Sequence, residues 1–134
     1  MNIKFLALLA LPLLFSACGN QNHEQVQIEL NEGQKWKVNE EMKPHIEQGQ
    51  ALLNTYVAES DTDYKKLAAN LQEQNSNLIK SCTMDGKSHD ELHKWLHPHL
   101  ELIKKLSNAN SPEEAAAITK ELQTSFEVYS AHFE

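Results

Sequence analysis

Four segments of the sequence carry apolar residues at the three- and four-residue spacing of a helix face, and short breaking sequences separate them. Because each segment would bury only one face, the four segments have to pack against one another. The expected helices follow Asn39, Asp61 or Thr62, Ser88 and Ser111, and they end near Ser60, at residues 84–86, at residues 108–110 and at Phe133. Short connections make neighbouring helices antiparallel, so we expect an all-α fold, an up-down-up-down four-helix bundle.

Two local signals support these helix starts. Ser88 and Glu91 have the spacing of a capping box, in which a serine and a glutamate satisfy the first free amides of a helix. Residues 111–114, Ser-Pro-Glu-Glu, combine an N-cap, a proline at the first helical position and acids at the positive end of the helix dipole.

The segment before the bundle predicts a short β-hairpin. Apolar residues alternate with polar ones over residues 26–30, a turn signal follows at residues 31–33, and Trp36 and Val38 resume the alternation. A two-stranded ribbon is marginally stable alone, so we expect it to lie on the helices as a lid.

The first eighteen residues have the pattern of an export signal. Lys4 precedes an apolar run from Phe5 to Phe15, which is too short for a membrane span of about twenty residues. Residues 14–18, Leu-Phe-Ser-Ala-Cys, resemble a bacterial lipobox, in which the cysteine receives lipid. We therefore expect a lipoprotein signal peptide over residues 1–17, lipidation of Cys18, a tether over residues 18–25 and a bundle domain over residues 26–134. The expected location is the bacterial cell envelope, facing the periplasm, with the outer membrane favoured.

Composition excludes several functions. The net charge is −7 and all 12 basic residues are lysines, so the chain lacks the surface that would neutralise phosphates and no nucleic-acid partner is expected. The sequence contains no recognisable catalytic triad and no closely spaced pair of carboxylates in an apolar stripe, so we do not expect an enzyme.

The expected topology gathers chemically unusual side chains at one end of the bundle, where the first and third helices begin and the second and fourth end. These side chains are Met42, His45, Cys82, Met84, His89, His93, Tyr129 and His132. The opposite end has no His, Cys or Met around residues 60–63 and 107–111. The asymmetry indicates a site at the first end.

Residue types at this end suit a transition-metal ion. His89 and His93 are four residues apart, so both imidazoles project from one helix face and can chelate one ion. Cys82, Met84 and Met42 would add soft sulfur, which favours copper, especially Cu(I), with zinc as the alternative. If Cys18 carries lipid, Cys82 has no intramolecular partner in a compartment that favours paired thiols.

Other interpretations of these residues stay open. His93 and His97 have the same four-residue spacing but lie further along the helix. Cys82 also fits a buried, inert thiol, Met42 also fits the core, and His99 is expected to be a core histidine.

Parts of the chain resemble the small periplasmic b-type cytochromes that are four-helix bundles. The resemblance rests on residues 39–42, Asn-Glu-Glu-Met, and on residues 114–129, which are similar to the last helix of that family. It implies haem b held by Met42 and a histidine near the end of the last helix. Ser130 stands at the family's histidine position, so the candidates here are His132 and His93. Residues 81–96 also resemble small bacterial lipoproteins of unestablished function.

The sequence therefore gives three functional hypotheses. The first is a lipid-anchored protein that binds a copper or zinc ion as a chaperone, buffer or sensor. The second is a haem-binding electron carrier, and the third is a module that binds an envelope protein without a metal.

Overall fold

The structure is a computed structural model that describes residues 27–134. The expected export signal, the lipidation site Cys18 and the tether lie outside the described residues. Within residues 27–134, no helix is both long and apolar enough to cross a membrane.

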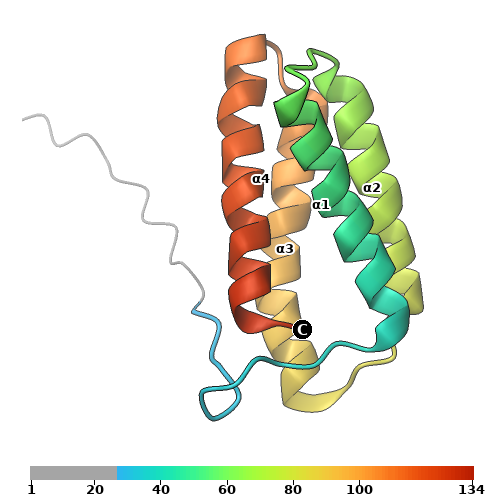
Figure 1. Ribbon diagram of the computed structural model, residues 1–134, viewed down its shortest axis with the longest axis vertical. Coiled ribbons are helices and arrows are strands. Elements are labelled where there is room, and N and C mark those ends of the chain that lie inside the picture. Colours follow the sequence, from blue (N-terminus) through green and yellow to red (C-terminus); the bar gives the residue numbers. More distant parts are fainter. Residues whose placement is uncertain (1–26) are drawn as a thin grey trace, which may run out of the picture.

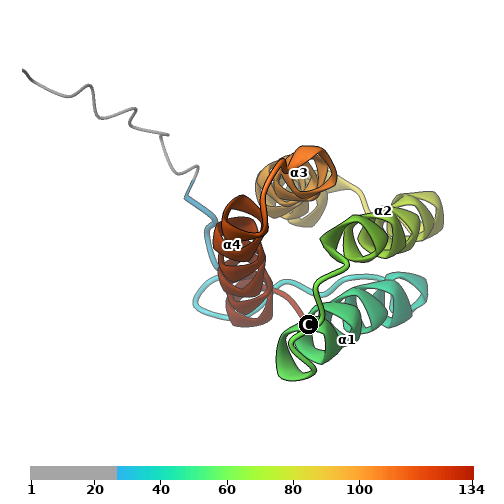
Figure 2. The same cartoon turned by 90° about the horizontal axis from the view of Figure 1, so that it is seen from above.

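Four helices and one helical turn make up the regular structure. They are η1 (Glu40–Met42), α1 (Lys43–Ala58), α2 (Tyr64–Ser81), α3 (Gly86–Asn108) and α4 (Pro112–His132). Each helix packs on the next in chain order, and α1 also contacts α4 (Figure 1). Seen from above, the four helices surround one common core (Figure 2). The predicted all-α, up-down arrangement is confirmed.

The observed helix starts agree with one local signal and contradict the other. Ser111 Oγ accepts a hydrogen bond from the Glu114 amide at 3.1 Å, as its N-cap pattern predicts. The capping box at Ser88 and Glu91 is wrong, because α3 begins earlier, at Gly86. Gly86 has φ +62°, a left-handed conformation that favours glycine, and this turns the chain into α3. Glu91 therefore lies inside α3 and not at its cap.

The predicted β-hairpin is wrong. Asn31 and Gln34 exchange two backbone hydrogen bonds of 2.9 Å around a tight turn, but no further pairing between the two arms occurs within the described residues. Trp36 pairs instead with the end of the chain: its amide donates to the His132 carbonyl at 2.8 Å, and its carbonyl accepts from the Glu134 amide at 2.9 Å. The physical reason is burial, because Trp36 is only 8% exposed whereas Leu30 on the other arm is 42% exposed.

Aromatic side chains gather in the core between α3 and the second half of α4. Trp95, Phe126, Tyr129 and Phe133 are all buried there. His99 is 1% exposed, stacks on Trp95 and has its Nδ1 2.8 Å from Ser125 Oγ, so the predicted core histidine is confirmed. Burial lowers the pKa of His99 to about 4.

Candidate functional site

The beginnings of α1 and α3 and the ends of α2 and α4 meet at one end of the bundle, as the topology predicts. Asn39 joins two of these elements, since its Nδ2 donates to the Ser81 carbonyl at 2.9 Å and its Oδ1 accepts from the Thr83 amide at 3.1 Å. The backbone pairing of Trp36 with residues 132–134 connects the end of α4 to the segment that precedes α1. These contacts tie together the segments before α1, after α2 and after α4 at the end of the bundle where α3 begins.

Three histidines of α3 form a continuous row, which we call the histidine ladder: His89, His93 and His97. His89 Nε2 lies 3.0 Å from His93 Nε2, and His93 Nδ1 lies 2.9 Å from His97 Nε2. Both ring pairs meet edge to face, with centroids 4.5 and 4.9 Å apart. The four-residue spacing produces this geometry because residues i and i+4 lie one above the other on a helix.

The middle ring of the ladder is disposed to stay neutral. Burial lowers the pKa of His93, and the neighbouring His89 and His97 lower it further when they are charged, whereas Asp90 opposes the shift. A neutral imidazole carries one N–H and one free lone pair, which suits both ladder hydrogen bonding and metal binding. The ladder is also accessible: His97 is exposed, and His89 and His93 are half-buried.

The predicted sulfur ligands occupy different surroundings. Met42 is 1% exposed and belongs to the core, while Cys82 and Met84 are half-buried and pack against it. Within the described part of the chain, Cys82 forms no disulfide. Among residues 27–134, no group of three or more His, Cys, Asp or Glu side chains is arranged to hold a metal ion. The structure thus brings His89 and His93 together, adds His97, and does not group Cys82 with them.

The three candidate haem ligands have different surroundings. Met42 is enclosed by the core, and His93 is the middle of the ladder. His132, at the end of α4, is half-buried and its Nδ1 lies 2.7 Å from the Val128 carbonyl, so it donates within its own helix. That hydrogen bond leaves Nε2 of His132 as the ring nitrogen available to a ligand.

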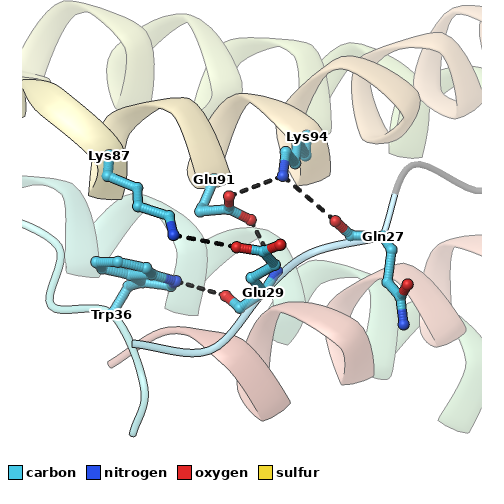
Figure 3. A network of polar contacts seen from close by, with 6 residues as sticks. All are labelled: Gln27, Glu29, Trp36, Lys87, Glu91 and Lys94. Carbon is cyan, nitrogen blue, oxygen red and sulfur yellow. Dashed lines mark hydrogen bonds and ion pairs between the residues drawn. The ribbon is translucent and has the colours of Figure 1, made fainter. Parts of the chain in front are cut away.

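Glu91 is a buried charged residue, although its spacing from Ser88 predicts a role in a helix cap. It is 2% exposed, and its two carboxylate oxygens accept from the Glu29 amide at 2.8 Å and from Lys94 Nζ at 2.7 Å (Figure 3). Burial alone would raise the pKa of Glu91, but these two hydrogen bonds and the charges of Lys94 and Lys87 outweigh it, so the pKa is lowered.

The contacts around Glu91 fasten residues 27–38, which we call the N-terminal strap, to α3. Lys94 Nζ also donates to the Gln27 carbonyl at 3.3 Å, and Lys87 forms an ion pair with Glu29 at 3.1 Å (Figure 3). Trp36 Nε1 donates to the Glu29 carbonyl at 2.6 Å and closes the network. The i, i+3 spacing of Glu91 and Lys94 was visible in the sequence, but their shared partners on the strap were not.

The helix arrangement agrees with the four-helix fold expected from the cytochrome resemblance. In comparisons with known proteins, no family model matches the chain, and no curated protein or solved structure gives a significant match.

Proposed function

We propose that this protein binds one transition-metal ion through His89 and His93, with copper favoured and zinc as the alternative. Two nitrogens bound to one ion at about 2.0–2.1 Å lie about 2.9 Å apart in square-planar geometry and about 3.3 Å apart in tetrahedral geometry. The observed separation of 3.0 Å between His89 Nε2 and His93 Nε2 falls between these two values. An ion can therefore replace the hydrogen bond without a change in the distance between the two nitrogens, once both rings turn their lone pairs toward it, and this separation carries the proposal.

Sulfur donors would determine which copper state is preferred. Cys82 and Met84 belong to the turn that leads into α3. Both side chains are half-buried and not enclosed by the core, so they are the proposed additional donors for Cu(I). Met42 is proposed as a further donor, but it would have to leave the core, where it is 1% exposed. With imidazoles alone, the same pair suits Cu(II) or Zn(II).

The proposed setting is the periplasm-facing side of a bacterial membrane, reached by the export signal and lipidation of Cys18. There the protein would act as a metal chaperone, buffer or sensor, and it would meet an envelope protein that supplies or receives the ion. The net charge of −7 would raise the local concentration of cations near the surface.

The first test is the metal content and absorption spectrum of the full-length chain in detergent, produced with copper, zinc and haem available. Stoichiometric copper or zinc without a Soret band supports the proposal. Iron with a Soret band would favour the haem-binding electron carrier, with Met42 and either His132 or His93 as ligands. A folded protein with neither would favour the envelope interaction module.

The second test locates the ion. In a chelator competition, the double variant His89→Ala/His93→Ala should lose tight binding of Cu(II) and Zn(II), while His45→Ala on α1 serves as the control. Cys82→Ser should weaken Cu(I) much more than Zn(II). Unchanged affinity of the double variant for all three ions would refute the site.

A further inference from the structure

The middle histidine of the ladder presents a different nitrogen to each neighbour. His93 uses Nε2 toward His89 at 3.0 Å and Nδ1 toward His97 at 2.9 Å. Both separations fit two nitrogens on one ion, which lie about 2.9–3.3 Å apart. The ladder is thus two pairs that share one ring, and no three-ligand group is arranged to hold an ion in the described part of the chain.

We propose that the ladder holds one ion in two alternative positions that share the ring of His93, so that the ion can move along α3 by leaving one pair of nitrogens and binding the other. The first position is His89 Nε2 with His93 Nε2, and the second is His93 Nδ1 with His97 Nε2. This inference rests on the proposed function and adds its mode of action: transfer rather than permanent storage.

Each position uses the remaining histidine as a supporting group. With the ion in the first position, the proton of His93 is on Nδ1 and is donated to His97 Nε2. With the ion in the second position, that proton is on Nε2 and is donated to His89 Nε2. Such hydrogen bonds to the second nitrogen orient a metal-bound histidine. The ladder therefore stabilises both positions with the same three rings.

Movement between the positions is balanced in ligands and protons. The bonds from the ion to His89 Nε2 and His93 Nε2 break, and bonds to His93 Nδ1 and His97 Nε2 form. One proton leaves Nδ1 of His93 to water, and one is taken from water at Nε2, so the net charge is unchanged. Exposure of His97 gives water and an incoming ligand access to the second position.

The test uses Zn(II) with a competing chelator on the full-length chain in detergent, in four forms: wild type, His89→Ala, His97→Ala and His93→Ala. We expect one ion per wild-type chain. His89→Ala and His97→Ala each keep one pair, so each should weaken binding by about 10-fold, whereas His93→Ala removes both pairs and should weaken it by more than about 100-fold. His45→Ala is the control and should bind as wild type.

Long-range proton–nitrogen spectra of ¹⁵N-histidine-labelled protein show which nitrogen of His93 binds the ion, and affinity measurements do not. Zinc should bind Nε2 of His93 in His97→Ala and Nδ1 of His93 in His89→Ala, and the wild type should show both forms.

The outcomes separate this inference from the proposed function. If one end variant binds as weakly as His93→Ala while the other loses no more than about 10-fold, there is a single fixed pair, and the shared-ring inference is overturned while the metal function stands. If all three variants are equally weak, the rings form one three-histidine site, with the same consequence. If His93→Ala binds as tightly as wild type, the proposed function itself fails.

Discussion

Replacing the buried Glu91 with alanine should destabilise the protein more than replacing an exposed glutamate of the same helix. The change removes the acceptor of two hydrogen bonds, from the Glu29 amide at 2.8 Å and from Lys94 Nζ at 2.7 Å. A hydrogen bond to a charged group contributes about 1.5–3 kcal/mol. The Lys94 side chain is 30% exposed and can be rehydrated, so its share is at the low end, and we expect a total loss of about 2–4 kcal/mol in the free energy of unfolding.

The same helix supplies a matched control. Glu101 and Lys104 form another i, i+3 pair on α3, but their atoms are 4.0 Å apart and their side chains are 65% and 69% exposed. Exposed pairs of this kind contribute about 0–1 kcal/mol, so Glu101→Ala should be nearly neutral. Denaturant unfolding followed by circular dichroism measures both variants, and the Tm of Glu91→Ala should fall by about 10 °C.

Two further readouts connect the loss to the strap. Amide hydrogen exchange should accelerate at Glu29 and Trp36 in Glu91→Ala but not in Glu101→Ala. Because the folded pKa of Glu91 is lowered, its contribution is present above the unfolded pKa and disappears as the pH falls through the folded value. Glu91→Gln should therefore remove part of the acid destabilisation seen below about pH 4.5. Equal unfolding free energies for the two alanine variants would refute the reasoning.

Three other substitutions test the core. Burial lowers the pKa of His99 to about 4, so the free energy of unfolding should fall by about 3 kcal/mol as the pH drops from about 6.5 to 4. His99→Gln should reduce this pH dependence, measured by denaturant titrations at several pH values. Asn75 is buried, and its Nδ2 has no hydrogen-bond partner among residues 27–134. Asn75→Leu should therefore raise the unfolding free energy by about 1 kcal/mol, and a lower Tm would contradict this. A Cβ on Gly49 would lie 3.3 Å from the Phe126 ring, so Gly49→Val should lower the Tm by forcing α1 from α4, whereas an unchanged Tm would show that the ring can move aside.

Helical periodicity was sufficient to predict the bundle. The apolar stripes of four segments specify which faces are buried, and short connections then leave few arrangements. The prediction that His99 is a core histidine is also confirmed, since its side chain is 1% exposed. Periodicity predicts the buried faces because each helix buries one continuous apolar stripe, whichever helix packs against it.

The hairpin and the role of Glu91 were not predictable in this way because both depend on contacts between distant segments. The strap pairs at Trp36 with the last residues of the chain, about one hundred positions away, and local alternation cannot reveal a partner at that distance. Glu91 is buried only because the Glu29 amide and Lys94 surround it. In the candidate site, spacing alone predicted that His89 and His93 meet, whereas the sulfur donors were placed by topology, which locates an end of the bundle but not individual side chains.

The strap and the ladder together suggest why the two features occupy one helix. Lys94 follows His93 directly, and its Nζ holds the Gln27 carbonyl at 3.3 Å, so the described chain begins beside the same half of α3 that carries the ladder. Eight residues lie between Cys18 and Gln27, and the nine Cα–Cα steps from one to the other span at most about 32 Å in a fully extended chain. If Cys18 is lipidated, the ladder is therefore held close to the membrane surface, within reach of a membrane-bound partner. Release of the strap in Glu91→Ala would lengthen this connection and leave the proposed metal ligands unchanged. If the proposed transfer takes place, it should weaken in that variant while the affinity for the ion remains.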